Sequence, residues 1–253
     1  MNRTPPWALV TGGGRRLGRA FVEALAGEGY AVAVHVHRSV SDGEALVEAL
    51  RRGGQEACLL VDDLADPAAP ARLLRDLQAR GRTPTVLVNN AARFDHDRLA
   101  SVEPTTFDHQ VAVNLRAPLL LCQAFARCLP ADADGLIVNL VDQRIARADP
   151  NFLSYGLTKA ALWAMTRNLA MELAPRVRVN AIAPGLALLD EGMDEATAQR
   201  IVGRFPLRTG GPAAEVVDAL RYLVRARSVT GQLLAVDGGA HLGRIASPVQ
   251  DAG

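Results

Sequence analysis

The side chains best suited to catalysis in this sequence are a tyrosine and a lysine four residues apart, Tyr155 and Lys159. At that spacing both side chains lie on one face of a helix. A phenol ordinarily loses its proton near pH 10, and a neighbouring ammonium lowers that pKa. Lys159 is the only lysine among 28 basic residues, and the other tyrosines, Tyr30 and Tyr222, have no lysine at the same offset. Because arginine differs from lysine in shape and hydration, this single lysine indicates proton chemistry at Tyr155.

A glycine-rich turn at residues 11–18, TGGGRRLG, lies where a short apolar run gives way to a helical pattern. Free backbone N–H groups and the dipole of the following helix attract phosphate at such a turn. The Gly-Lys-Ser/Thr ending of a P-loop is missing, so we expect a dinucleotide rather than a P-loop ligand. The turn residues expected to contact it are Gly12, Arg15, Arg16, Leu17 and Gly18.

The end of the second apolar run indicates which dinucleotide is bound. It reads His37-Arg38-Ser39, about 20 residues past the turn, where an NAD site has a carboxylate for the ribose 2′-hydroxyl. An arginine at this place suits a 2′-phosphate instead, and Arg15 lies nearby in the turn. Arg38 therefore predicts NADPH as the cofactor, although an ordinary surface arginine would give the same pattern.

Short apolar runs separated by amphipathic segments predict the elements that must position these residues. Such runs, without polar alternation, are typical of a parallel sheet covered on both faces. We therefore expect a single α/β domain over residues 1–253, a Rossmann-type doubly wound parallel sheet with helices on both faces and a loose tail from about residue 244. The expected strands are residues 7–10, 31–35, 57–61, 85–88, 136–141, 177–182 and 232–236. The expected helices are residues 17–27, 45–52, 68–80, 105–129, 154–173, 191–203 and 213–224.

The composition excludes several other classes of protein. A formal net charge of +1 argues against a nucleic-acid binder held by a basic face, and 4% aromatic residues argue against base-stacking platforms. The sequence has no apolar run of the roughly 18 residues that span a bilayer, and its start lacks a secretory pattern. We therefore expect a cytoplasmic protein with no membrane partner. Three scattered cysteines, Cys58, Cys122 and Cys128, predict neither a metal site nor a disulfide framework.

Several spaced motifs make nearly the whole chain resemble the short-chain dehydrogenases/reductases. These motifs are the turn at residues 11–18, Asp63-Leu64, Asn89-Asn90-Ala91, Asn114, the Tyr155/Lys159 pair, Pro184-Gly185 and Val236-Asp237-Gly238-Gly239. The resemblance implies that Tyr155 donates or accepts the proton, and that Lys159 lowers its pKa and holds the nicotinamide ribose. It implies that Asn114 fixes a water for proton relay. Further cofactor contacts are implied at Asp63, Leu64, Asn90, Ala91, Pro184 and Gly185.

Three positions depart from the family pattern. The family has a serine thirteen positions before the tyrosine, where this sequence has Asp142. An ionised carboxylate repels the charge that develops on a ketone oxygen, but a carboxyl group can deliver or anchor a proton at an imine-like nitrogen. Arg16 replaces a glycine of the turn, where a Cβ disfavours positive φ, so we expect a slightly different turn and a guanidinium that reaches the pyrophosphate or the substrate. After Asn89-Asn90-Ala91, Ala92 replaces the family's usual glycine, and Phe94 in the same loop is expected to stack on a flat ring held against the nicotinamide.

Together these departures resemble the pteridine reductases and the similar bacterial dihydromonapterin reductases within the family. We therefore expect an NADPH-dependent reductase that transfers hydride to a C=N bond of a pterin such as dihydromonapterin, dihydrobiopterin or dihydrofolate. The substrate contacts are expected at Arg16, Phe94, Asp142 and Tyr155. The variable segment at residues 186–210 does not identify the pterin, and it lacks the threonine that many relatives place over the carboxamide.

Two other functions stay open from the sequence. An NADPH-dependent carbonyl reductase, for example of 3-oxoacyl thioesters, is disfavoured by Asp142. A non-catalytic NADP-binding sensor is disfavoured by the intact pair Tyr155 and Lys159. The resemblance also implies a homo-oligomer, a tetramer, that packs through the two long helices expected at residues 105–129 and 154–173.

Overall fold

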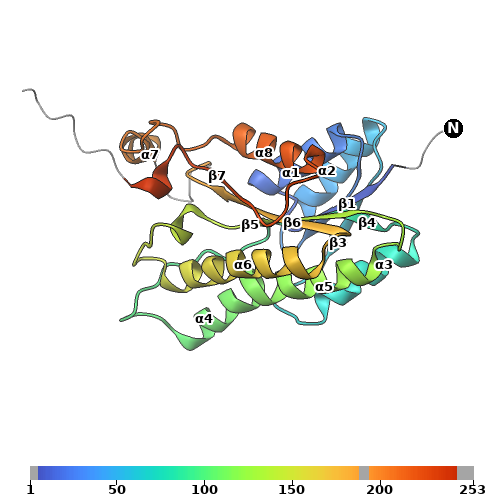
Figure 1. Cartoon of the computed structure of the whole chain (residues 1–253), viewed down its shortest axis with the longest axis horizontal. Coiled ribbons are helices and arrows are strands. Elements are labelled where there is room, and N and C mark those ends of the chain that lie inside the picture. The colour runs from blue at the N-terminus through green and yellow to red at the C-terminus, as the bar shows by residue number, and fades with distance from the viewer. Residues whose placement is uncertain (1–4, 188–193, 244–253) are drawn as a thin grey trace, which may run out of the picture.

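A seven-stranded parallel sheet forms the middle layer of the computed structural model, which describes residues 5–187 and 194–243 (Figure 1). The strand order is β3-β2-β1-β4-β5-β6-β7, and every neighbouring pair is parallel. The strands are β1 Trp7–Val10, β2 Ala31–Val36, β3 Ala57–Val61, β4 Pro84–Asn89, β5 Gly135–Leu140, β6 Val177–Pro184 and β7 Leu233–Val236. The predicted doubly wound parallel sheet is confirmed, and chain order reverses between β1 and β4.

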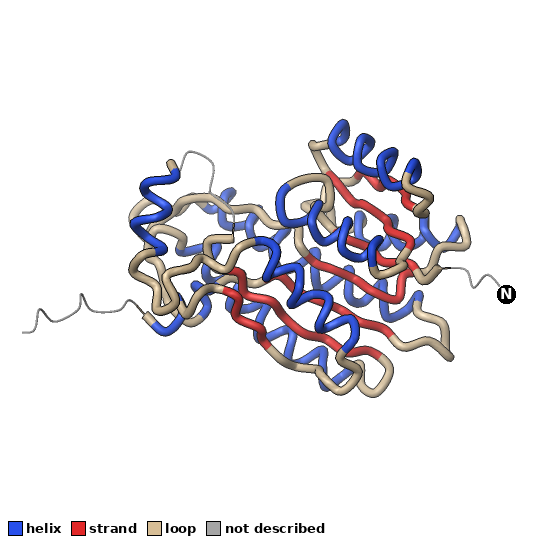
Figure 2. The backbone as a smooth tube through the Cα atoms, turned by 90° about the horizontal axis from the view of Figure 1, so that it is seen from above, coloured by secondary structure: helices blue, strands red, loops and turns tan. Residues whose placement is uncertain are grey.

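Helices cover both faces of this sheet (Figures 1 and 2). One face carries α1 Arg16–Gly27, α2 Val40–Arg52 and α8 Ala213–Arg225. The other carries α3 Ala69–Ala79, α5 Ala117–Cys128 and α6 Leu153–Glu172, with α4 Pro104–Val111 beside α6. The short helix α7 Glu195–Val202 lies near β7.

Two apolar cores result, because successive side chains of a strand point to opposite faces of the sheet. In β1, Ala8 and Val10 belong to the core under α1, α2 and α8, whereas Trp7 and Leu9 belong to the core under α3 and α5. All four side chains are buried. The unalternating apolar strands of the sequence are therefore explained by burial on both faces.

The helix expected at residues 105–129 is interrupted. It consists of α4, a π-helical turn Ala112–Arg116 (η1) and α5. At the end of the turn the Ala117 N–H donates to the Ala112 carbonyl, five residues back. Pro118 follows in the first turn of α5 and has no N–H to continue an α-helical ladder, which fits a change of register at this place.

Other boundaries differ by a few residues. The second helix begins at Val40 rather than at residue 45, and Asp42 in its first turn is favourable for the helix dipole. α7 begins at Glu195, and the expected helical residues 191–193 lie outside the described part of the chain. The tail predicted from residue 244 also lies outside it.

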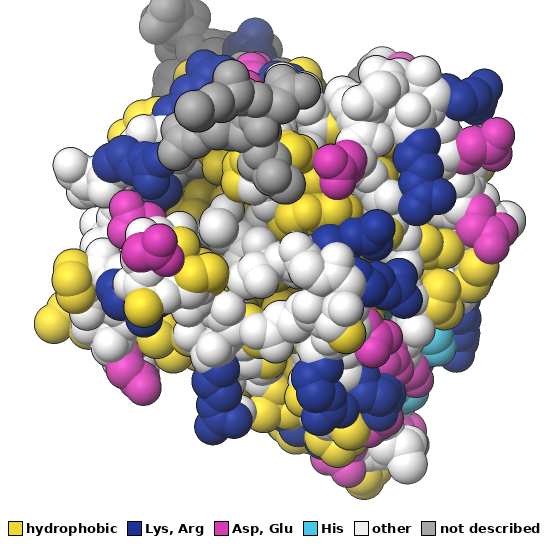
Figure 3. Space-filling model, turned by 90° about the vertical axis from the view of Figure 1, so that its right-hand side faces the viewer, with side chains coloured by type: hydrophobic (Ala, Val, Ile, Leu, Met, Phe, Trp, Pro, Cys, Tyr) yellow, Lys and Arg dark blue, Asp and Glu magenta, His cyan; other side chains and the backbone are white. Residues whose placement is uncertain are grey.

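Basic and acidic side chains are interspersed on the face that Figure 3 shows. This distribution agrees with the balanced net charge of the sequence. Among the described residues, no helix has the length and apolar character needed to cross a bilayer.

A buried histidine in β2, His35, joins the glycine-rich turn to the end of β3. The Gly12 N–H donates to His35 Nδ1 at 3.3 Å, and His35 Nε2 lies 3.2 Å from the Asp62 carbonyl oxygen. Because Nδ1 accepts, Nε2 carries the proton and donates, so the imidazole is neutral. Burial lowers the pKa of His35 to about 4.

We expect His35 to make the fold sensitive to mild acid. Below its pKa of 6.5 the unfolded chain takes up a proton at this histidine, whereas the folded chain does not until about pH 4. The free energy of unfolding should therefore fall by about 3 kcal/mol from pH 6.5 to pH 4, and the contribution is complete above pH 6.5. Urea denaturation across this range measures the effect. His35→Gln should flatten the dependence and His109→Gln, on α4, should not; an unchanged slope in His35→Gln would contradict the assignment.

Candidate active site

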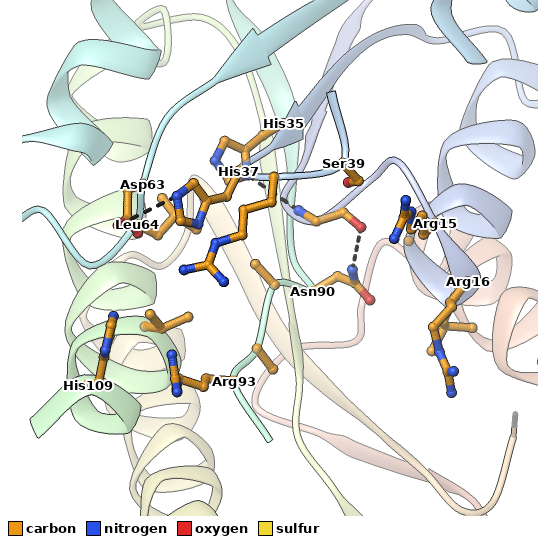
Figure 4. A pocket seen from close by; sticks show the side chains of 17 residues that line it. Arg15, Arg16, His35, His37, Ser39, Asp63, Leu64, Asn90, Arg93 and His109 are labelled. Carbon is orange, nitrogen blue, oxygen red and sulfur yellow. Dashed lines mark hydrogen bonds and ion pairs between the residues drawn. The ribbon is translucent and has the colours of Figure 1, made fainter. Parts of the chain in front are cut away.

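A pocket of about 590 Å³ opens at the carboxyl ends of β1 to β4, where the strand order reverses (Figure 4). Ligands of open α/β sheets bind at this type of place. Most residues predicted to hold the cofactor line it: Gly12, Arg15, Arg16, Leu17, Gly18, His37, Arg38, Ser39, Asp63, Leu64, Asn90 and Ala91. The pocket also contains residues that the sequence did not single out for the site, namely His35, Ala92, Arg93, His109 and Val113.

The turn at residues 11–18 needs its glycines for close packing. Gly12 has φ +62°, and a Cβ at Gly18 would lie 2.0 Å from the Gly12 carbonyl oxygen. A side chain at Gly18 would therefore push the first helical turn away from the loop. Without these side chains a ligand can approach the backbone closely at the start of α1, as phosphate binding requires.

Arg16 corrects one expectation about this turn. The sequence predicted that its Cβ would keep it out of positive φ, but Arg16 has φ +50°. That value lies in the small left-handed region, which non-glycine residues enter at a cost. The turn thus has its left-handed residue despite the substitution, and the Arg16 side chain lies at the pocket (Figure 4).

The end of β4 is tied to the turn by side-chain hydrogen bonds. Thr11 Oγ1 accepts from the backbone N–H groups of Asn90 and Ala91, each at 3.0 Å. Asn90 Nδ2 donates to the carbonyl oxygens of Thr11 at 2.9 Å and Gly12 at 3.2 Å. The amide of Asn90 therefore braces the pocket floor in addition to lining it.

The corner expected to receive a 2′-phosphate lies between the end of β2 and the start of α2. Arg38 is exposed there, and Ser39 immediately precedes α2. Arg15 Nε is 2.5 Å from Asp42 Oδ2, so its guanidinium is already paired with a carboxylate. His37 Nε2 is 3.7 Å from Asp63 Oδ2. Arg38 is thus better placed than Arg15 to supply the charge for a phosphate.

The second part of the site lies at the end of β5. Tyr155 and Lys159 are on one face of α6, as predicted, and both are buried. The Tyr155 hydroxyl donates to Asp142 Oδ2 at 3.1 Å. Lys159 Nζ donates to the Leu140 carbonyl at 2.7 Å and lies 5.6 Å from the centroid of the Tyr155 ring. Burial lowers the pKa of Lys159 to about 8, while the charge of Asp142 acts in the opposite direction.

Asn114 lies in the π-helical turn, at a type of irregularity that often marks functional sites. Its Oδ1 accepts from the Arg93 N–H at 2.7 Å, and its Nδ2 donates to the Arg93 carbonyl at 2.9 Å and to Thr158 Oγ1 at 3.2 Å. Asn114 therefore fixes the loop after β4 against α6. Because Asn114 holds both backbone groups of Arg93, it also positions Phe94, the next residue.

Phe94 belongs to an aromatic wall beside Tyr155. Its ring stacks on Phe152 with centroids 4.4 Å apart and meets the edge of Tyr155 at 4.7 Å. The ring of His96 packs on Phe152, with ring centroids 4.0 Å apart. Phe94 is 37% exposed, so part of this side chain is accessible to a ligand.

One charged residue of this region was not predicted. Arg144 Nη1 lies 3.0 Å from Asp142 Oδ2, and its guanidinium carbon is 4.6 Å from the Phe152 centroid. The only local signal was its position two residues after Asp142.

The remaining predicted cofactor residues, Pro184 and Gly185, lie at the end of β6, beside β5. A Cβ at Gly185 would come within 2.6 Å of the Gly210 carbonyl oxygen and 2.7 Å of Asp237 Cα, so close backbone packing requires glycine there. Of the variable segment at residues 186–210, residues 188–193 lie outside the described part of the chain.

The residues present fit a dinucleotide with a 2′-phosphate. The pocket combines a glycine cradle at the start of α1, an arginine at the end of β2 and the polar side chain of Asp63 at the end of β3. It runs toward the loop of Arg93, which adjoins the Tyr155 cluster. A nicotinamide at that end would lie near a phenol, an ammonium and a carboxylate, a set that can hold and move a proton.

Comparison with known proteins gives consistent matches. A family model described as enoyl-(acyl carrier protein) reductase matches residues 14–241. The putative ketoacyl reductase 2 of the granaticin polyketide synthase from Streptomyces violaceoruber is 34% identical over 244 residues, covering 94% of this chain and 96% of that protein.

Solved structures are more similar still. The FolM alternative dihydrofolate reductase 1 from Brucella suis in complex with NADP is 41% identical, with a TM-score of 0.91 over 98% of this chain and 99% of that one. The corresponding NADP complex from Brucella canis is 40% identical, with a TM-score of 0.91 over 96% and 97%.

We expect Arg38→Gln to weaken NADPH binding by about 10- to 150-fold, the loss of a charge-assisted phosphate contact, and to change NADH binding little. Fluorescence titration with each nucleotide measures this difference. Arg80→Gln, at the exposed end of α3, is the matched control. Equal affinity of the unmodified protein for the two nucleotides would contradict the assignment of this corner.

Proposed function

The chain belongs to the short-chain dehydrogenase/reductase family, and we propose that within this family it reduces a C=N bond of a pterin with NADPH. The observation that carries this proposal is the hydrogen bond from the Tyr155 hydroxyl to Asp142, at the position where the family pattern has serine. The NADP-bound dihydrofolate reductases that the chain resembles at 40–41% identity support it.

NADPH supplies the hydride when it is bound. The turn at residues 11–18 would hold its pyrophosphate, and Arg38 with Ser39 would hold the 2′-phosphate. Asp63 and Leu64 would flank the adenine. Lys159 would hold the nicotinamide ribose, although its ammonium donates to Leu140 in the structure, so this role requires a second donor hydrogen of the same group.

Tyr155 would supply the proton of the reaction. Its hydroxyl donates to Asp142, and Lys159 lies one turn further along the same face of α6. A ketone oxygen gains negative charge during reduction and would be repelled by Asp142, whereas a C=N nitrogen gains a proton. The carboxylate therefore favours the nitrogen substrate.

The flat ring of a pterin would lie against Phe94. The Phe94 ring lies next to Tyr155 and is stacked on Phe152. Arg16, which lines the cofactor pocket, would contribute a cationic hydrogen-bond donor. Asn114 would act chiefly by fixing the loop that carries Phe94.

A second function is favoured by other relatives. The granaticin ketoacyl reductase and a 3-oxoacyl-[acyl-carrier-protein] reductase from Staphylococcus aureus, 29% identical over 240 residues, bear names of carbonyl reductases. Reduction of a 3-oxoacyl thioester is therefore the alternative. Loss of NADPH absorbance with dihydrobiopterin, dihydromonapterin, dihydrofolate and an acetoacetyl thioester separates the two.

We expect Asp142→Asn to lower turnover of a dihydropterin by about 100-fold or more, because Tyr155 loses the carboxylate that anchors it and general acid catalysis is typically worth about 10²- to 10⁴-fold. The amide keeps the size of the side chain but removes its charge. Asp142→Ser should introduce a neutral hydroxyl donor and bring weak ketone reduction. NADPH affinity should stay unchanged in both variants, because Asp142 lies outside the nucleotide pocket.

Steady-state kinetics of both variants on a dihydropterin and a ketone test this expectation. Full pterin turnover by Asp142→Asn would remove Asp142 from the reaction. Efficient ketone reduction by the unmodified protein, without pterin reduction, would support the alternative function instead.

We further propose that the protein forms a homo-oligomer, a tetramer, through its long helices. Phe107 on α4, Leu119 on α5 and Leu157 on α6 are exposed apolar residues, whereas Leu162 of the same region belongs to the core. Light scattering at micromolar concentration should give about four times the chain mass of 26.9 kDa. A mass equal to that of one chain would refute the assembly.

A further inference from the structure

Arg144 makes the closest charged contact to Asp142. It lies in a short 3₁₀ turn, Gln143–Ile145, directly after β5 and Asp142. Its backbone N–H donates to Asp142 Oδ1 at 2.8 Å, and its Nη1 lies 3.2 Å from Oδ1 and 3.0 Å from Oδ2. The side chains of Arg144 and Asp142 are only 20% and 13% exposed, so solvent screens this pair little.

Every hydrogen bond of the Asp142 carboxyl group in the described site is one that it accepts. Oδ1 accepts from the Arg144 backbone and guanidinium, and Oδ2 accepts from the Arg144 guanidinium and the Tyr155 hydroxyl. Only the ionised carboxylate accepts at both oxygens without donating. The arrangement therefore suits a carboxylate that anchors a donor, and it does not suit a carboxylic acid that delivers a proton.

The guanidinium of Arg144 is also held from its flat side. Its central carbon lies 4.6 Å from the Phe152 centroid and 5.3 Å from the Phe94 centroid, both within cation–π range. Its Nε is 3.7 Å from Asp149 Oδ2. A planar cation is required to stack on rings and pair with a carboxylate at the same time, and lysine cannot do both.

We propose that Arg144 is a positioning residue for the reaction, which holds Asp142 as a carboxylate against Tyr155 and ties this pair to the aromatic wall of Phe94 and Phe152. The inference rests on the proposed function only for the choice of substrate. In the proposed reaction the carbon of the C=N bond receives the hydride of NADPH. Its nitrogen receives the proton of the Tyr155 hydroxyl, which solvent then restores. Asp142 stays ionised throughout.

The test is a double-mutant cycle on turnover. Arg144→Gln should lower kcat by about 10- to 100-fold, the range for a lost hydrogen bond to a charged group, and leave the Kd of NADPH unchanged. In an Asp142→Asn background the same change should cost less than about threefold, because Arg144 then has no carboxylate to hold. Arg144→Lys should restore part of the loss by retaining the charge. Arg147→Gln, three residues along the same loop, is the matched control and should keep full turnover.

Other outcomes would overturn the inference. If the losses from Arg144→Gln and Asp142→Asn multiply, Arg144 acts independently of Asp142. If Arg144→Gln weakens NADPH binding and lowers the melting temperature without lowering kcat, Arg144 is a structural residue only. The cycle is measured on a dihydropterin and on an acetoacetyl thioester. An enzyme that reduces only the thioester refutes the proposed function, while the coupling of Arg144 to Asp142 is still read on that substrate.

Discussion

The hydrogen bond between Tyr155 and Asp142 is the contact on which the rest of the site depends, because its two partners come from different elements. Asp142 follows β5, and Tyr155 lies near the start of α6. A small shift of the helix along the sheet would separate them. The ammonium of Lys159 opposes such a shift, since it donates to the carbonyl of Leu140, two residues before Asp142. The lysine thus fixes α6 to β5 as well as carrying charge.

A different set of contacts fixes the loop after β4. Asn114 bonds both backbone groups of Arg93, and the Asp97 N–H donates to the Asn151 carbonyl at 3.1 Å. The Ser154 N–H then donates to Asp97 Oδ1 at 3.0 Å, immediately before Tyr155. The loop bearing Phe94 and the start of α6 therefore form one unit, and the aromatic wall is as well supported as the polar groups it adjoins.

Much of this arrangement could be predicted because its signals are local. The glycines near Gly12, the strand periods and the spacing of Tyr155 and Lys159 are each set by a few neighbouring residues. The role of Arg144 could not be predicted, because it depends on Phe94 and Phe152 being brought together by the fold. The π-helical turn was missed because a helical apolar pattern continues through a change of register. The conformation of Arg16 was predicted wrongly, since the steric preference of a single residue does not decide its φ in a tight turn.

The single lysine gives the chain an unusual chemical property. Reagents directed at primary amines have only Lys159 and the chain's amino terminus to react with. Lys159 is 2% exposed, and its pKa near 8 leaves a large share of the amine unprotonated in mildly alkaline buffer. Acylation of this side chain therefore requires the amine to leave its contact with Leu140, and its rate depends on the population of that open state. The protein thus carries, in its own sequence, one buried side-chain amine whose labelling reports opening of its catalytic centre.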